Sequence, residues 1–455
     1  MTKTSTIKNP DIKYNTPYIL GISFVAALGG YLFGFDFAVI AGALPFLRTT
    51  FHLSPVWEGF LTGTLALGCI AGCLLAGKIA DRYGRRPGLI VSATIFAVSS
   101  LGMAFSPHLF EFLIMRFSAG TGVGMASMLS PLYIAEISPA NVRGRNVAIN
   151  QLTIVLGILI TNLVNYLLAG RRTDIWRWMF GLGVIPSSLF LLGVLFLPES
   201  PRWLLKAGYT EKAAAVLSKI GSPGFVSQSM LEIGKTVNRG VAGSYKAVFA
   251  KAVRPAVMVG ITLAVFQQFC GINVVFNYAP AIFKSVGANL DKQLLETVAI
   301  GIVNTLFTLL AMWQVDRLGR RPLMLMGALG LAAVYVILAI LLQEHAGLIV
   351  VSVFVLLAIG LYATSLAPVT WVIISEIFPN NIRGSASSVA VVSLWIAYFI
   401  LVFTFPILTQ HLGAYWAFYL YAGICLAGFV FIKFKVKETK GQTLEELEQN
   451  LTRHQ

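Results

Sequence analysis

Charged residues are scarce in this sequence. Asp, Glu, Lys and Arg make up 12% of its 455 residues, whereas hydrophobic residues make up 57%. A soluble domain carries about twice that share of charge, so the composition excludes an ordinary soluble protein and indicates an integral membrane protein. Residues 1–16 are polar. The apolar run after them is too long for a cleavable signal, so we expect it to remain as a spanning helix.

Cysteine and histidine are also few, and neither forms a recognisable site. All four cysteines lie in apolar stretches, and Cys69 and Cys73 lack the spacing of a Cys-x-x-Cys redox or metal motif. The five histidines are dispersed near ends and loops. Gly120-x-Gly122-x-Gly124 lies within a spanning segment and follows no strand, so small residues for close helix packing explain it better than a phosphate loop. We expect no disulfide, no metal, no cofactor and, without a Walker motif, no ATP-driven step.

Long apolar runs are what the sequence has instead. Twelve runs of about 20 residues or more can each cross a bilayer as a helix. They start near residues 17, 55, 87, 108, 145, 176, 253, 294, 322, 347, 384 and 414. The sequence therefore predicts an all-α membrane protein with twelve spanning helices.

The net charge of +15 could suggest a nucleic-acid partner, but its distribution favours another explanation. If both termini lie in the cytoplasm, 27 of the 34 Lys and Arg residues fall on the cytoplasmic side, six fall outside and Arg116 falls within the membrane. This is the positive-inside rule. We therefore expect no nucleic acid, a lipid bilayer as the environment, and a multi-pass protein of the plasma membrane. Short outer loops without an Asn-x-Ser/Thr sequon suggest a bacterial inner membrane.

One long polar break divides the apolar runs six and six. We expect a cytoplasmic N-terminus over 1–16, a first bundle over 17–197, an intracellular linker over 198–252, a second bundle over 253–436 and a cytoplasmic tail over 437–455. Within the linker, the patterns around Glu211–Lys219 and Ser227–Val237 predict short amphipathic helices at the membrane surface.

The two halves repeat one another. The segment Asp81–Pro87 recurs as Asp316–Pro322, 235 residues later. Residues 136–144 recur as 376–384, 240 residues later, and 198–200 have a weaker echo in 437–439, 239 residues later. Three matches at nearly one offset indicate a duplicated six-helix unit. Parallel repeats of this kind are typical of transporters whose substrate site lies between the halves near the middle of the membrane.

The repeated loops mix acids with arginines. Such groups can pair across neighbouring helix ends when the inner side is closed, and they separate when it opens; the alternative is that they are only orientation signals. The cytoplasmic latch that we predict consists of Asp81, Arg82, Arg85, Glu136, Arg143, Glu199, Asp316, Arg317, Arg320, Glu376 and Arg383.

Three motifs carry a resemblance to a known family. They are the duplicated Asp-Arg-x-Gly-Arg-Arg loops, Pro198-Glu199-Ser200-Pro201-Arg202-Trp203 and Gln267-Gln268-Phe269-x-Gly271-Ile272-Asn273. Together they resemble the sugar porter family of the major facilitator superfamily, from Gly29 to about Leu447. The resemblance implies two six-helix bundles that rock about a central sugar site, with a short intracellular helical linker.

A sugar presents a ring of hydroxyls with apolar faces, so a selective site needs side-chain amides and an aromatic surface. The long apolar helices contain few such groups, and the resemblance implies that these positions contact sugar. The predicted substrate-binding residues are Gln151, Gln267, Gln268, Asn273, Asn304 and Trp371, with Phe33 and Tyr278 lining the cavity. Gln267 and Asn273 share a face only if their helix is distorted, and Gly271 makes a break there plausible. The alternative is that these amides only join packed helices.

Four positions depart from the pattern of related symporters. Ile158 replaces a glutamine about two turns after Gln151, and Asn277 replaces the first of a Tyr-Tyr pair. Leu394 stands where a polar amide usually precedes Trp395, and Ala367 replaces a glycine. With fewer polar anchors from the eleventh helix, the sequence does not identify the sugar.

Asp36 is the one charged residue in the apolar run from Pro17 to Leu47. An ionised carboxylate there costs several kcal/mol unless it is paired. It lies 12 residues from Arg48, about 18 Å along a helix, and Arg116 lies nine residues from Pro107, about 13 Å. The similar depth predicts a pair that protonation of Asp36 would release, which is the logic of a proton-coupled switch. In similar porters, aspartate at this position goes with proton symport and asparagine with facilitation. The alternative is a static buried ion pair.

We interpret the sequence as a monomeric transporter that moves a hexose or pentose by alternating access, with a proton as the coupling ion. A facilitative uniporter for a sugar or polyol is the first alternative. A sugar sensor that binds without transporting is a second, disfavoured by the short tail after Val436. A membrane-embedded enzyme is a third. We expect no enzyme, because no pair of carboxylates is placed to face a common cavity.

Overall fold

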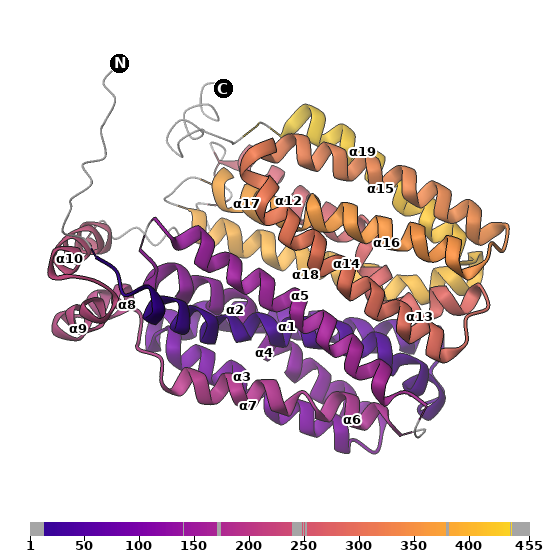
Figure 1. Cartoon of the computed structure of the whole chain (residues 1–455), viewed down its shortest axis with the longest axis horizontal. Helices are drawn as coiled ribbons and strands as arrows, with labels where there is room; N and C mark the ends of the chain where they lie inside the picture. The colour runs from indigo at the N-terminus through magenta and orange to yellow at the C-terminus, as the bar shows by residue number, and fades with distance from the viewer. Residues whose placement is uncertain are drawn as a thin grey trace.

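The computed structural model of the protein describes residues 13–139, 141–170, 174–238, 248, 250, 253–378, 382–436 and 438. The elements in these ranges are helices, apart from one isolated bridge between Tyr14 and Gly221. Figure 1 shows the long helices as two bundles lying side by side, with a few short helices gathered at one end. Within the described residues, 12 helical segments are long and apolar enough to cross a membrane, which confirms the prediction from the sequence.

The helices follow the predicted order. The first bundle consists of α1 (Thr16–Thr50), α2 (Pro55–Tyr83), α3 (Arg85–Phe105), α4 (Leu109–Ile137), α5 (Arg143–Leu168), α6 (Trp176–Gly181) and α7 (Val184–Leu195). The second consists of α12 (Arg254–Phe269), α13 (Ile272–Ser285), α14 (Leu290–Leu318), α15 (Arg320–Gln343), α16 (Leu348–Thr364), α17 (Leu366–Ile377), α18 (Arg383–Leu412) and α19 (Ala414–Lys435).

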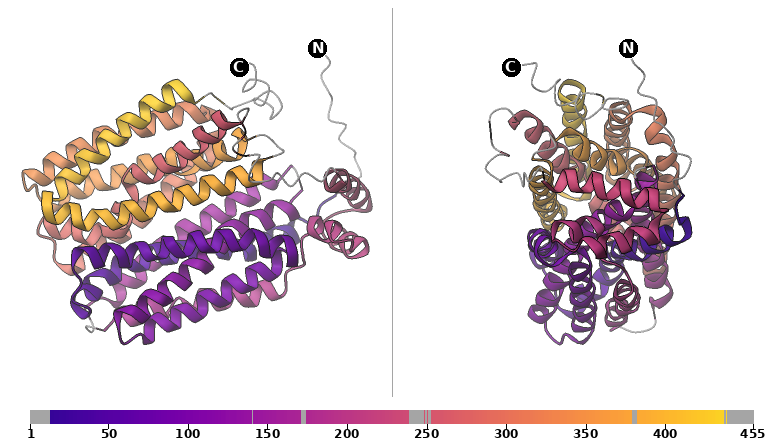
Figure 2. Two further views of the ribbon diagram at one scale, coloured as in Figure 1. Left: turned by 180° about the vertical axis from the view of Figure 1, so that it is seen from behind. Right: turned by 90° about the vertical axis from the view of Figure 1, so that its left-hand side faces the viewer.

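Three short helices connect the bundles at one end of the molecule. They are α8 (Pro201–Lys206), α9 (Thr210–Ile220) and α10 (Pro223–Asn238), and α9 and α10 match the two amphipathic helices that the sequence predicts. Figure 2 shows them outside both bundles. We call this end the linker end and the opposite one the far end. Most of the predicted N-terminal segment 1–16, part of the linker and nearly all of the tail 437–455 lie outside the described residues.

Small residues let helices of the first bundle pack closely. A Cβ added at Gly120 on α4 would lie 2.2 Å from the carbonyl oxygen of Leu65 on α2, and one at Gly124 would lie 2.3 Å from that of Cys69. Such contacts leave no room for any side chain. Glycines therefore bring the α2 and α4 backbones together, as in other membrane bundles, and this holds Arg116 of α4 close to α2.

Two spanning segments of the second bundle are broken into pairs of helices. Between α12 and α13, Gly271 adopts a left-handed conformation with φ of +86°. Between α16 and α17, Ser365 has φ of −124° and ψ of −84°. The second break follows from Pro368, because its ring clashes with the carbonyl of Thr364, where α16 ends. Both breaks free backbone carbonyls inside the bundle, where such interruptions line binding sites.

Candidate functional site

The break at Gly271 brings the predicted amides together. Gln268 and Asn273 are five residues apart, yet the Asn273 Nδ2 donates to the Gln268 Oε1 at 2.5 Å. The Gln268 Nε2 in turn donates to the Gln267 Oε1 at 3.3 Å. The sequence predicted this distortion from the need for Gln267 and Asn273 to share a face, and α12 indeed ends just before Gly271.

Gln267 connects this amide cluster to the second broken segment. Its Nε2 lies 3.3 Å from the carbonyl oxygen of Ala367 and 3.5 Å from that of Leu366, at the start of α17. Gln267, Gln268 and Asn273 are between 2% and 6% exposed. Three amides and two backbone carbonyls at the start of α17 thus offer donors and acceptors at one place, which is what hydroxyl recognition requires.

The other predicted sugar contacts lie on neighbouring helices. Gln151 is half-buried on α5, and Asn304 is buried on α14. These two helices meet across the bundles, where the Asn162 Nδ2 donates to the Thr297 carbonyl oxygen at 2.8 Å. Asn304 lies about 10 Å further along α14 towards the linker end. Trp371 on α17 is 42% exposed.

Aromatic side chains fill the space between the bundles. The ring of Phe33 on α1 lies edge-on to Trp395 of α18, with centroids 5.7 Å apart. Phe37 packs against Tyr398 of α18 at 5.1 Å. The Tyr278 hydroxyl donates to the Val402 carbonyl oxygen at 2.7 Å, and it also lies against Thr62 of α2. Phe33 and Tyr278 therefore both lie at the contact between the bundles.

Asp36 and Arg116 lie together, both completely buried. The Arg116 Nη1 is 3.5 Å from the Asp36 Oδ1. Arg116 is held by other contacts as well: its Nε donates to the Leu61 carbonyl oxygen at 2.9 Å, and its guanidinium lies over the Phe180 ring at 5.8 Å. The arginine is thus anchored to α2 and α6 independently of the carboxylate.

The ion pair is incompletely satisfied. Neither carboxylate oxygen of Asp36 has a hydrogen-bond partner among the described residues, and the same is true of the Arg116 Nη1 and Nη2. Loss of water penalises the ionised carboxyl, whereas the guanidinium stabilises it. A buried charge pair without hydrogen bonds gains little over its desolvation cost.

The two bundles meet from the middle of the molecule to the far end. A Cβ added at Gly59, near the far end of α2, would lie 2.2 Å from the Phe403 carbonyl oxygen, and one at Gly63 would lie 2.7 Å from the Phe399 ring. On the other side of the interface, Gly301 of α14 packs directly against Leu159 of α5. These close contacts shut the far end.

Ion pairs at the linker end connect elements of the first half. The Arg85 Nη2 donates to the Glu136 Oε1 at 2.9 Å, joining α3 to α4, and the Ser200 hydroxyl donates to the other oxygen of that carboxylate. Asp81 pairs with Lys206 of α8 at 3.2 Å. Arg82 lies over Tyr83.

The remaining predicted latch residues are described only in part. Arg143 is exposed at the start of α5, and Arg317 lies over the Trp313 ring at 3.9 Å. The side chains of Asp316, Glu376 and Arg383 lie outside the described residues.

Two acids occupy equivalent places in the two halves. Glu199 accepts hydrogen bonds from the backbone N–H groups of Arg85 and Arg86 at the start of α3. Glu438 accepts from those of Arg320 and Arg321 at the start of α15, each at 3.0 Å. A carboxylate at a helix N-terminus satisfies free N–H groups and complements the helix dipole. The weak repeat of 198–200 in 437–439 therefore has a structural basis.

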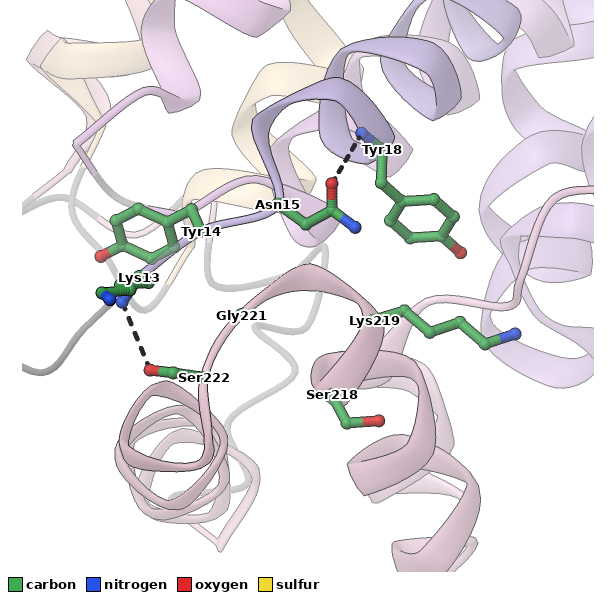
Figure 3. A pocket seen from close by; sticks show the side chains of 8 residues that line it. All are labelled: Lys13, Tyr14, Asn15, Tyr18, Ser218, Lys219, Gly221 and Ser222. Carbon is green, nitrogen blue, oxygen red and sulfur yellow. Dashed lines mark hydrogen bonds between the residues drawn. The ribbon is translucent and has the colours of Figure 1, made fainter.

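A shallow cleft of about 650 Å³ lies at the linker end, where the chain enters α1. Figure 3 shows the side chains that line it. The backbone N–H of Lys13 donates to the Ser222 hydroxyl, and the backbone N–H of Tyr18 donates to the Asn15 Oδ1. The Asn15 nitrogen also donates to the Ile220 carbonyl oxygen at 2.8 Å. The cleft is the joint between α1 and the linker, and the amide cluster lies deep in the second bundle, away from it.

Sequence reasoning missed one functional candidate next to the amide cluster. The Tyr398 hydroxyl donates to the Asn277 Oδ1 at 3.1 Å, and the Asn277 Nδ2 donates to the Asn273 carbonyl oxygen at 2.6 Å. Asn277 was visible in the sequence as a departure from the related pattern. Tyr398 carried no signal, because one tyrosine in an apolar helix is indistinguishable from core packing.

The chain is similar to known proteins over nearly its whole length. The family described as sugar (and other) transporter matches residues 22–451. The D-xylose-proton symporter of Escherichia coli K12 is 39% identical, over 96% of this chain and 96% of that protein. The arabinose-proton symporter of Bacillus subtilis is 34% identical, over 98% and 99%.

A solved structure agrees as well. The xylose transporter XylE of E. coli in an inward open conformation superposes with a TM-score of 0.85 at 38% identity, covering 95% of this chain and 100% of that one. The described residues form 12 helices that are long and apolar enough to cross a membrane, and the similarity to these relatives extends over nearly the full length. The chain therefore belongs to the sugar (and other) transporter family and has the major facilitator fold.

Proposed function

We propose that the protein is a proton-coupled symporter that moves a monosaccharide across the bacterial inner membrane by alternating access. The observation that carries this proposal is the buried pair of Asp36 and Arg116, at 3.5 Å, in which the carboxylate has no hydrogen-bond partner among the described residues. A structural ion pair needs good geometry to repay its desolvation. A pair this loosely held is suited to take up and release a proton.

The substrate class follows from the amide cluster. Gln267, Gln268 and Asn273 supply donors and acceptors in one place, and Trp371 offers an exposed aromatic face. Amides that both donate and accept fit hydroxyl groups, and an indole fits the apolar face of a pyranose ring. Gln151 and Asn304, on the two helices that meet across the bundles, would close the site around the sugar. The amides and the indole carry no charge, so they do not imply a phosphate or carboxylate substrate.

The linker end faces the cytoplasm in this proposal. The excess of Lys and Arg in the loops at that end follows the positive-inside rule and places both termini inside. Close contacts shut the far end, so the outside has no access to the site in this conformation. One chain supplies both bundles and hence a whole site, so a monomer suffices.

Coupling then works through the charge state of Asp36. On the outside, protonation neutralises the carboxylate and releases its attraction to Arg116, which favours sugar binding and closure. On the inside, the proton leaves and the ion pair reforms. The Arg85–Glu136 pair joins α3 to α4 within the first bundle and is made in this conformation, so it does not by itself act as the contact that separates when the inner side opens.

Transport in liposomes tests the coupling directly. A counterflow panel of labelled pentoses, hexoses and inositol identifies the sugar. With that sugar, wild-type protein should show uptake-dependent alkalinisation of the outside and accumulation driven by a proton gradient. Asp36→Asn should keep exchange but lose both. The matched control is Glu111→Gln, an exposed acid on the helix that carries Arg116, which should behave as wild type. If Asp36→Asn still concentrates sugar, the protein is not coupled through this residue.

A further inference from the structure

A single chain of hydrogen bonds runs through the second bundle, and all of its donors point the same way. Its steps are Tyr398 Oη to Asn277 Oδ1 (3.1 Å), Asn277 Nδ2 to Asn273 O (2.6 Å), Asn273 Nδ2 to Gln268 Oε1 (2.5 Å), Gln268 Nε2 to Gln267 Oε1 (3.3 Å) and Gln267 Nε2 to Ala367 O (3.3 Å). It joins α18, α13, α12 and α17. At Asn273 the chain passes from one group to another, because Asn277 binds its backbone carbonyl and Gln268 binds its side-chain amide. The two parts are therefore linked through the position of Asn273.

One end of this chain lies against the helix that carries the proton site. The Tyr398 ring packs on Phe37, the residue after Asp36, with centroids 5.1 Å apart. The charges of Asp36 and Arg116 both act on the Tyr398 hydroxyl. Among the described residues, Cys69 interacts with both Asp36 and Tyr398, and Tyr278 interacts with Tyr398. Both are buried side chains without charge in their ordinary state.

We propose that Tyr398 and Asn277 are positioning residues through which the protonation state of Asp36 reaches the sugar-binding amides. This proposal rests on the symport function proposed above. Tyr398 also supplies the polar anchor from the eleventh spanning helix that Leu394 lacks, and it does so indirectly, through Asn277.

The direction of the effect follows from charge. While Asp36 is ionised, its negative charge offsets that of Arg116 at the Tyr398 hydroxyl. Once Asp36 binds a proton, the positive charge of Arg116 is unopposed, and a nearby cation makes a phenol a stronger donor. The bond to Asn277 strengthens, and Asn277 in turn holds the backbone carbonyl of Asn273. With its backbone fixed, Asn273 keeps its amide against Gln268 before the sugar arrives. Preorganised groups bind more tightly, so sugar affinity should rise as the pH falls.

The test is the pH dependence of sugar affinity. Titration calorimetry in detergent with D-xylose and D-glucose should give wild-type protein a Kd roughly tenfold lower at pH 5.5 than at pH 8, a usual size for coupling between two sites. In Asp36→Asn, the Kd should be the same at pH 5.5 and pH 8. Tyr398→Phe keeps the ring against Phe37 and removes only the hydroxyl. It should still bind sugar, with a ratio close to one.

The matched control is Tyr335→Phe. Tyr335 is a fully buried tyrosine of the same bundle, on α15, and its hydroxyl has no hydrogen-bond partner among the described residues. This variant should keep the wild-type ratio. A wild-type ratio in Tyr398→Phe overturns the proposal, and so does a wild-type Kd that is independent of pH.

A second variant removes the acceptor of the Tyr398 hydrogen bond instead of its donor. Asn277→Leu should lose the pH dependence as Tyr398→Phe does, and the double variant should lose no more than either one, because residues of one network are not additive. A wild-type ratio in Asn277→Leu would contradict the link even if Tyr398→Phe proved unstable. If wild-type protein binds no sugar of the transport panel at any pH, the proposed function fails and this link fails with it.

Discussion

Glu199 shows how one residue combines a structural contact with a sensitivity to pH. Burial raises the pKa of its carboxyl above the ordinary 4.5, and hydrogen bonds from the backbone of Ser200, Arg85 and Arg86 only partly oppose this. A raised pKa means that the folded protein binds this proton more tightly than the unfolded chain does. The contribution of Glu199 to stability therefore falls as the pH rises from 4.5 through the raised value.

A glutamine at this position should reveal that dependence. Glu199→Gln keeps an acceptor oxygen for the N–H groups of α3 but has no proton to lose. The melting temperature of wild-type protein relative to this variant should therefore be highest near pH 5 and decline towards pH 8, as followed by intrinsic fluorescence. Glu211→Gln, in the exposed first turn of α9, controls for the loss of one negative charge. A relative stability of wild type that instead grows with pH would show that the capping bonds outweigh burial.

At this scale the sequence was informative wherever a residue is unusual for its surroundings. A lone acid and a lone arginine at similar depth predicted the contact between Asp36 and Arg116. The amides of α12 and α13 stood out in the same way. Tyr398 could not be found, because its role depends on the bond to Asn277, 121 residues away. Only the rotation of α18 about its own axis decides which neighbour its hydroxyl meets.

Gly271 decides the shape of its spanning segment at the scale of the element. Its φ of +86° costs a residue with a side chain about 1–2 kcal/mol. A Cβ there would also lie 2.5 Å from the Tyr421 ring. The break between α12 and α13 sets Gln268 beside Asn273. It depends on glycine for two reasons: the positive φ and the lack of space for a Cβ beside Tyr421.

Gly271→Ala should therefore lower both the thermal stability and the sugar affinity. The matched control is Gly287→Ala, because Gly287 has a similar φ of +84° but open space where the Cβ would be. It should lose about 1–2 kcal/mol of stability from the backbone alone and keep its sugar affinity. Equal losses of affinity in the two variants would contradict the idea that the break at Gly271 positions the amides.

The two breaks differ in how far they could be foreseen. Gly271 predicted the first, because two amides six residues apart needed a distortion to act together. The second, at Ser365, was not predicted. Its cause is Pro368, three residues further on, which disrupts the turn before it. The conformation that Ser365 adopts as a result also depends on its packing against Gly327 of α15.

The whole molecule is shut at its far end by contacts between the bundles. Among them is one hydrogen bond that crosses the interface, from the Asn162 Nδ2 to the Thr297 carbonyl oxygen. Asn165, three residues later on α5, makes a similar bond to the Ala38 carbonyl oxygen at 3.0 Å, but within the first bundle. The two asparagines therefore form a natural pair for comparison.

Asn162→Leu should open the far end, whereas Asn165→Leu should not. One net hydrogen bond is worth about 0.5–1.5 kcal/mol, or roughly a 2- to 12-fold shift in the equilibrium between the two states. Spin labels at Val56 and Leu295, exposed positions near the starts of α2 and α14, would report the shift as a longer distance by pulsed paramagnetic resonance. The four native cysteines are buried, which limits background labelling. Equal shifts in both variants would mean that the bond across the interface does not govern closure.

The sequence by itself determined the properties that depend on position along the chain. Apolar runs of bilayer length set the number of spans, the loop charges set the expected orientation, and the duplicated motifs set the division into two bundles. Only the tertiary structure decided which side chains meet across helices: Glu438 with the start of α15, Tyr398 with Asn277, Asn162 with Thr297. The physical reason is that a bilayer selects segments by length and hydrophobicity. The partner of each polar group, by contrast, depends on how every helix is rotated and packed against its neighbours.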